Sequence, residues 1–192
     1  MRALTKILVA AALTTFCATL APLAFAADEE LSAEAKQAAR ETRLKLASDG
    51  LGKLYQLQPE AKAAVAAAVG YAVFEVDSIY AVLFVGQQGK GLLHDNATKQ
   101  VTYMLSKRVG TGPGAGKQTV YQIFVFKTKQ AFDQFVAAGS AGGDLGASAS
   151  TGTGGIVRSF NPSIDIYQVP ISGRAIQASW GGTVYSVDTQ LK

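Results

Sequence analysis

The sequence predicts an α+β fold, in which N-terminal helices are followed by a curved, mostly antiparallel sheet with one intervening helix. Helical periodicity is confined to the first part of the expected domain, about residues 31–69. From residue 70 onward, short apolar runs alternate with glycine-rich and polar segments, which is typical of strands and turns. Regular strand–helix alternation, which a parallel sheet requires, is missing.

An export signal precedes this domain in residues 1–26. Two basic residues near the start are followed by an apolar stretch from Ile7 to Leu23 and by Ala24-Phe25-Ala26, the small-residue pattern that signal peptidase cleaves. The alternative is a lipoprotein signal acylated at Cys17, but the bulky Phe16 before it favours cleavage near Ala26. We therefore expect a periplasmic or secreted protein.

The remainder, residues 27–192, has the size of one domain, roughly 100–200 residues. Cys17 is the only cysteine of the chain, so no disulfide is expected in the cleaved protein. No later segment contains 18 consecutive apolar residues, and we expect no transmembrane helix there. With two of the 18 basic residues in the signal and all 14 acidic residues outside it, the net charge after cleavage is only +2. This small charge does not predict nucleic-acid binding.

Two helices are expected first. Ala27 to about Leu57 is expected to be helical, with Ser32 placed to cap the helix and a break or kink expected at Asp49-Gly50 and Gly52. Pro59 suits the first turn of a second helix, over 60–69. On the first helix, Lys36, Arg40 and Arg43 are expected on a different side from an arc of mostly small apolar residues.

The rest of the chain predicts strands and one short helix. Expected strands cover 71–76, 79–85, 101–105, 120–126, 164–169, 174–179 and 183–187. The run 120–126 is almost entirely apolar, which predicts a central strand covered on both faces. Turns are expected at 86–91 and 180–182, and a helix at 129–138 with Phe132, Phe135 and Val136 on its inner side.

All 20 glycines lie beyond the signal, and they cluster at 110–116 and 139–155. Gly116-Lys117 is followed by Gln118, and Thr111 stands where a phosphate loop requires glycine, so the pattern for nucleotide binding fails. The segment also precedes an expected strand, whereas phosphate-binding glycines open a helix. Tight turns and bulges in a curved sheet explain these glycines better.

Catalysis is not expected. His94 is the only histidine, and no serine has the G-x-S-x-G context of a nucleophile elbow. With one imidazole and no thiol after cleavage, the residues predict no metal site and no cofactor. The alternative of a hydrolase that uses His94 with Asp95 depends on this one pair of residues.

The order of several blocks resembles one known family. The blocks are Ala68 to Phe74, Gly89-Lys90-Gly91, Gly110 to Gly116 before Val120 to Phe126, Phe132 to Phe135, Gly143 to Ser150, Gly152 to Gly155, and Ile166-Tyr167. Together they are similar to the SYLF domain, a lipid-binding family, over roughly Leu31 to Lys192. Many members have a tryptophan after the helix that contains Phe132, where this chain has Gly139-Ser140-Ala141-Gly142.

The resemblance implies affinity for anionic phospholipid, made in some members by a basic N-terminal helix. The comparable segment here, 33–46, contains Lys36, Arg40 and Arg43. Independently of the resemblance, Lys90, Lys107-Arg108 and Lys117 are placed to form a basic rim around the glycine-rich loop, unless they only keep turns soluble. The helix cations have a similar alternative, a solvated helix face.

The sequence thus predicts a non-catalytic phospholipid or membrane-surface binding protein of the bacterial envelope. The alternative is an envelope scaffold that binds another protein through a sheet edge or through the segment 139–155.

Overall fold

The computed structural model describes residues 31–141, 150–151, 155–157, 161–179 and 182–192. Leu31–Lys192 forms one compact unit. The expected signal with Cys17 and Ala26, most of the glycine-rich segment 139–155, and the expected turn at Trp180-Gly181 lie outside the described residues.

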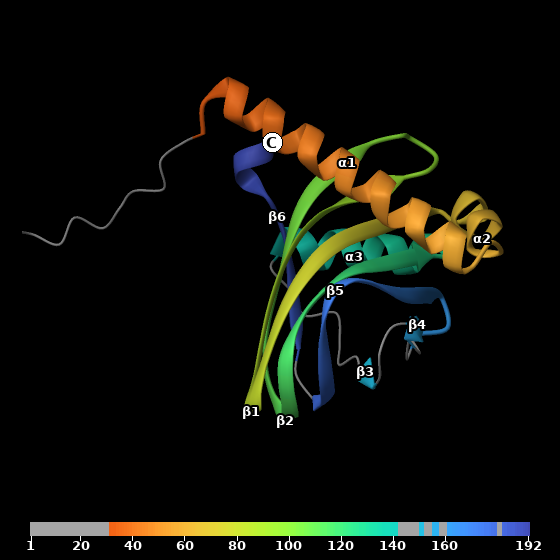
Figure 1. The fold of residues 1–192 in the computed structure, drawn as a ribbon. Helices are drawn as coiled ribbons and strands as arrows, with labels where there is room; N and C mark the ends of the chain where they lie inside the picture. The colour runs from red at the N-terminus through yellow and green to blue at the C-terminus, as the bar shows by residue number, and fades with distance from the viewer. Residues whose placement is uncertain (1–30, 142–149, 152–154, 158–160, 180–181) are drawn as a thin grey trace, which may run out of the picture. The chain divides into compact units, whose positions relative to one another are not determined.

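The described residues form a mixed α+β fold, which confirms the predicted class (Figure 1). In chain order the elements are α1 (Ala33–Leu57), α2 (Ala61–Ala67), β1 (Gly70–Asp95), β2 (Val101–Phe126), α3 (Lys129–Ala141), β3 (Ser150–Thr151), β4 (Gly155–Val157), β5 (Ile164–Ser179), β6 (Thr183–Val187) and the 3-10 helix η1 (Thr189–Leu191). The helices precede the sheet, and α3 interrupts the strands.

The sheet is antiparallel at every strand pair formed by the described residues, and β2 is its central strand. β2 pairs with β1 along its length, with β5 along its C-terminal half, and with β6 along its N-terminal half. The run 120–126 lies between β1 and β5, and six of its seven residues are buried. The prediction of a central strand there is confirmed.

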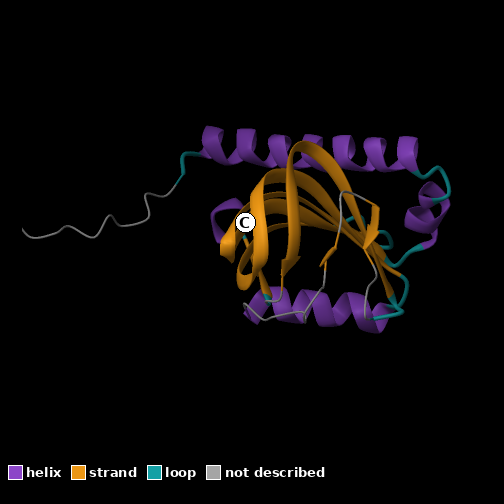
Figure 2. Ribbon diagram, turned by 60° about the horizontal axis from the view of Figure 1, so that its bottom comes forward, coloured by secondary structure: helices purple, strands orange, loops and turns teal. Residues whose placement is uncertain are grey.

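The sheet lies between α1 and α3 (Figure 2). One apolar core joins α1 and α2 to one sheet face, where Leu46 and Leu54 pack with Val73 and Ile123. A second core, rich in aromatic side chains, joins the opposite face to α3. Alternation along β1 and β2 supplies both cores, because successive side chains point to opposite faces. In α3, Phe132 and Phe135 are buried as predicted, but Val136 is exposed.

Several predicted strand ends are wrong, because the strands are longer than the sequence indicates. β1 continues through the expected breaks at Asp77-Ser78 and 86–91, and β5 joins two expected strands. Gly91 is needed for close packing, since a Cβ there would collide with the carbonyl oxygen of Val73. A glycine that admits a neighbouring backbone looks, in sequence, like a glycine that makes a turn.

The predicted cap at Ser32 is confirmed, but the first helix is continuous. Ser32 Oγ accepts a hydrogen bond from the Ala35 amide at 3.2 Å, as an N-cap does. The expected break at Asp49-Gly50 is wrong, because α1 continues to Leu57. Gly50 faces the sheet, where a Cβ would lie 3.0 Å from Val73 Cγ1. Gly50 therefore lets the helix approach the sheet closely.

Candidate functional site

β1 and β2 both bend near their middles. The bends lie at the lower end of the sheet in Figure 1, away from α1 at the top. The register shifts between Val82 and Phe84, and Val82 has a φ of +52°, a left-handed conformation that β-branched residues rarely adopt. The bend in β2 falls within the glycine-rich segment 110–116. These glycines thus form a bulged, bent strand, which agrees with the expected bulges in a curved sheet.

Large apolar side chains are exposed at this bend. We call the following group the apolar tip: Ile79, Val82, Leu83, Phe84 and Val109. The exposed fraction of the residue reaches 76% for Val82 and 72% for Val109. No charged residue occurs between 79 and 89 in β1 or between 109 and 116 in β2. The bend therefore exposes several large apolar side chains on two uncharged segments, a combination that marks interaction sites in soluble proteins.

The inner side of the bend is packed and hydrogen-bonded. Tyr80 and Val85 are buried against each other beneath the tip. The Tyr80 hydroxyl accepts hydrogen bonds from Gln87 Nε2 at 2.9 Å and from Gln118 Nε2 at 3.4 Å. The first bond joins the two arms of β1, the parts of the strand before and after the bend, and the second bond joins β1 to β2. The apolar side chains are consequently held outward by a structured base.

Three of the predicted basic residues are exposed on the strands that lead to the tip. Lys90 in β1 and Lys107 in β2 are diagonal neighbours, because Lys90 pairs with Leu105 and Lys107 pairs with Gln88. Val109 lies two residues beyond Lys107, so it shares that face. Lys117 is exposed on the other arm of β2, beyond the bend, and it pairs with Ile79 of β1. Arg108, by contrast, is 4% exposed and points inward.

The basic residues of α1 do not gather on one surface. Arg43 is buried on the helix face that also contains Leu46, Ala47, Gly50 and Leu54. Its Nη2 lies 3.1 Å from Asp188 Oδ2. The expectation that Arg43 lies apart from the packed face is wrong, because the buried arc is the one that meets the sheet and η1. Lys36 is half-buried near the N-terminus of the helix.

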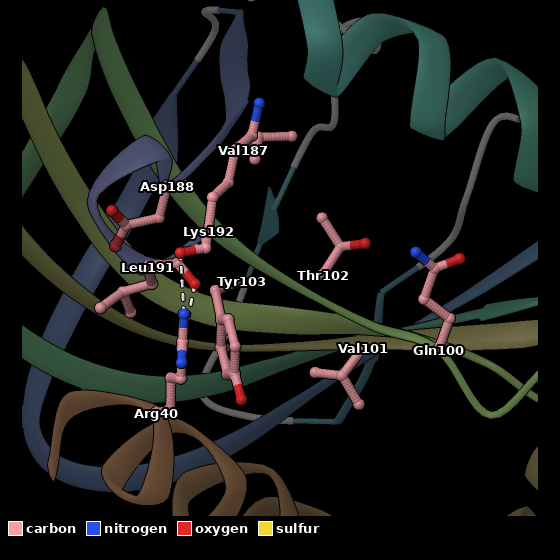
Figure 3. A pocket seen from close by; sticks show the side chains of 9 residues that line it. All are labelled: Arg40, Gln100, Val101, Thr102, Tyr103, Val187, Asp188, Leu191 and Lys192. Atoms are coloured by element: carbon pink, nitrogen blue, oxygen red, sulfur yellow. Dashed lines mark hydrogen bonds between the residues drawn. The ribbon is translucent and has the colours of Figure 1, made fainter. Parts of the chain in front are cut away.

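Arg40 contacts the C-terminal segment. Its Nε and Nη2 donate hydrogen bonds to the carbonyl oxygens of Leu191 at 3.1 Å and Lys192 at 2.8 Å (Figure 3). These residues line a cavity of about 500 Å³ together with Tyr103 and the start of β2. Arg40 and Arg43 thus fasten α1 to the end of the chain, and both guanidinium groups are engaged internally.

His94 has a structural environment. Its ring stacks on Tyr71 with centroids 4.9 Å apart, and its Nδ1 lies 3.2 Å from Asn96 Oδ1. Asn96 Nδ2 donates to the carbonyl oxygens of Val65 and Ala68, both at 2.9 Å. Backbone amides of Thr98 and Ala97 lower the pKa of the Asp95 carboxyl, which caps the turn. In this structure, His94 Nδ1 contacts the Asn96 side chain, while the Asp95 carboxylate accepts hydrogen bonds from backbone amides of the turn.

Neither metal-binding clusters nor membrane-spanning helices occur in the part of the chain that the structure describes. The apolar tip was not predicted from the sequence. The only trace of it in the sequence is the high content of large apolar residues in 79–85. Such residues on both faces of a strand are typical of a buried strand, so the pattern does not predict their exposure.

No family model matches the sequence, so the SYLF resemblance stays a prediction. The chain is similar to a protein named beta cell expansion factor A from Aeromonas veronii, with 30% identity over 171 residues. The alignment covers 86% of this chain and 65% of that protein, so the chain spans less than two thirds of the relative's length.

Proposed function

We propose that this protein binds phospholipid membrane surfaces without catalysis, and that the apolar tip is the part that enters the membrane. The observation that carries the proposal is the exposed, uncharged cluster at the bend of β1 and β2. Exposed lysines on the adjoining strands are placed to meet anionic headgroups, as in other interfacial elements.

The energetics favour shallow insertion. Fully burying a Val, Leu or Phe side chain contributes about 1.5–3 kcal/mol. Because between one half and three quarters of Val82, Leu83, Phe84 and Val109 is exposed, insertion gains roughly 1–2 kcal/mol for each. Each nearby lysine adds up to about 1 kcal/mol at an anionic surface. The sum, reduced by the cost of immobilisation, corresponds to weak and partly salt-sensitive binding.

The tip replaces α1 as the main contact in this proposal. Arg43 is buried and paired, and Arg40 bonds the C-terminal segment, so neither is available to a headgroup without loss of an internal contact. Lys90, Lys107 and Lys117 remain the headgroup contacts, while the buried Arg108 is left out.

The SYLF resemblance and the expected export signal support a location in the bacterial envelope. The name of the Aeromonas relative concerns the expansion of beta cells and mentions no ligand. The competing proposal, an envelope scaffold, would use the same exposed tip to bind another protein. Binding to pure lipid vesicles separates the two proposals.

The test is flotation with vesicles of phosphatidylcholine containing phosphatidylglycerol. The tip variant is Leu83→Thr with Phe84→Thr, which keeps residues that favour strands. We expect its affinity to fall about 30-fold, which corresponds to about 2 kcal/mol. The matched control is Leu44→Gln with Leu57→Gln, two exposed leucines on α1.

The control protein should float like the wild type. Equal flotation of the tip variant and the wild type would exclude tip insertion. Absence of flotation of the wild type with any vesicle would favour the scaffold.

A further inference from the structure

A small cavity lies beside the apolar tip, on the arm of the sheet that contains Lys117. Its volume is about 270 Å³, and β1, β2 and β5 all line it. Ile79, which belongs to the apolar tip, forms part of its wall. A ligand in this cavity would therefore lie next to the surface that the tip contacts.

The cavity contains both signs of charge. Asp77 and Lys117 are exposed, and they lie on the same face of the sheet, because Asp77 pairs with Thr119 while Lys117 pairs with Ile79 two residues nearer the bend. The pairing continues across β5, where Ser172 lies beside Thr119. The carboxylate of Asp77 and the hydroxyls of Thr119 and Ser172 thus form one row across the three strands. The ammonium group of Lys117 lies in the next row on the same face, nearer the tip.

The two charged groups do not neutralise each other. Asp77 Oδ1 accepts a hydrogen bond from Thr119 Oγ1 at 2.7 Å, which fixes the carboxylate. Within the described residues, Lys117 forms no ion pair and no hydrogen bond with a side chain. The cavity therefore offers a fixed negative group and an available positive group, separated along one strand face.

We propose that this cavity binds a zwitterionic phospholipid headgroup, with the phosphate at Lys117 and the headgroup ammonium at Asp77. The inference rests on the proposed function, because it assigns the headgroup class to a surface that the tip brings to the membrane. The cavity wall formed by Ile79 favours a lipid over a free phosphate compound, since the acyl chains would leave the cavity along the tip. The Ser172 hydroxyl is an additional donor to a phosphate oxygen, whereas the proton of the Thr119 hydroxyl is donated to Asp77.

The order of the rows fits this orientation. In a phospholipid, the phosphate lies between the acyl chains and the terminal ammonium. Lys117 is the residue nearer the bend, and Asp77 is farther from it. A headgroup anchored by acyl chains at the tip would therefore meet the positive group first and the negative group second.

The experiment compares two vesicle compositions with identical acyl chains: phosphatidylcholine, which has phosphate and ammonium, and phosphatidylglycerol, which has phosphate only. The variants are Asp77→Asn, which retains an acceptor for Thr119, and Lys117→Gln. The matched control is Lys107→Gln, another exposed lysine near the tip. Dissociation constants and melting temperatures are measured for each protein.

Asp77→Asn should weaken binding to phosphatidylcholine about fivefold. It should leave binding to phosphatidylglycerol unchanged or tighter, because a negative charge is removed. Lys117→Gln should weaken binding to both vesicles, and on phosphatidylcholine it should do so more than Lys107→Gln does.

Equal effects of Asp77→Asn on the two vesicles, or no effect on either, would overturn the headgroup assignment. The tip variant keeps the two proposals distinguishable. If tip insertion is right and the headgroup assignment is wrong, the tip variant has a lower affinity for both kinds of vesicle, while Asp77→Asn changes the affinity for the two kinds equally or not at all.

Discussion

Arg43 of α1 and Asp188, which precedes η1, form a buried ion pair between residues 145 positions apart, with Nη2 3.1 Å from Oδ2. Both residues are less than a tenth exposed. Arg43 Nε and Nη1 are buried without a hydrogen-bond partner, so the guanidinium depends on this one carboxylate. Removing either partner leaves an uncompensated buried charge.

The first prediction concerns this pair. Asp188→Ala should lower the free energy of unfolding by about 3 kcal/mol, because Arg43 then loses its counter-ion. The double variant Arg43→Met with Asp188→Leu should recover most of that loss, since no charge stays buried. Urea denaturation checks both. The double variant should also float with vesicles like the wild type. Reduced flotation would show that α1 takes part in membrane binding.

The second prediction uses two glycines of the same helix. Gly52→Ala should raise the free energy of unfolding by about 1 kcal/mol, because no atom lies within 4 Å of the added Cβ and alanine favours the helix. Gly50→Ala should lower it by about 1–3 kcal/mol, because the Cβ would press on Val73 and Tyr121. Thermal or urea unfolding of the two variants gives the comparison. A stabilising Gly50→Ala would show that the helix–sheet spacing is adjustable.

The third prediction concerns alkaline pH. Burial raises the pKa of Tyr55, Tyr71, Tyr121 and Tyr167 above the ordinary value of 10.0. The folded state therefore keeps these protons after the unfolded chain has lost them. The free energy of unfolding should be constant with respect to these groups below about pH 10, and it should fall as pH rises beyond that value.

Melting temperatures measured between about pH 8 and 11.5, with tyrosinate absorbance as the second readout, check this dependence. Tyr71→Phe should reduce the slope, because one of the four groups no longer titrates. An unchanged slope in that variant would assign the alkaline unfolding to other groups.

The fourth prediction concerns Asn96. Its side-chain amide donates to the carbonyl oxygens of Val65 and Ala68, the last turn of α2 and its C-cap. Asn96→Ala removes both bonds and should lower the free energy of unfolding by about 2 kcal/mol. Gln100→Ala, at an exposed position after the same turn, is the control and should change stability by less than about 0.5 kcal/mol. Similar losses in both variants would contradict the role given to Asn96.

Sequence patterns located the helices and the central strand, although they did not predict that α1 is continuous. Ser32, Phe132 and the run 120–126 have the structures their local patterns predict, because capping and period are properties of neighbouring residues. Strand continuity was not predictable in this way. Gly89 and Gly91 allow close packing of one arm of β1 on the other, a contact between segments that local patterns do not relate.

The candidate site depends even more on long-range contacts. The run 79–85 was expected to be a strand, and the bend at Val82, where several of its side chains are exposed, was not expected. On α1, the periodicity of apolar residues predicted that Arg43 lies apart from the packed face. The ion pair with Asp188 instead holds this side chain within that face. The exposed lysines of the strands were found from sequence, while their arrangement around the apolar tip follows from strand register.

The bend that creates the apolar tip lies within strands and not at their ends. Both β1 and β2 continue from the tip in two directions, and all four of these segments stay paired in the sheet. The tip is therefore supported by four chain segments, whereas a loop is supported by two. Such a projection has little conformational freedom to lose when it meets a partner. Its geometry is preorganised, and its affinity should depend on which side chains it presents more than on how they become ordered.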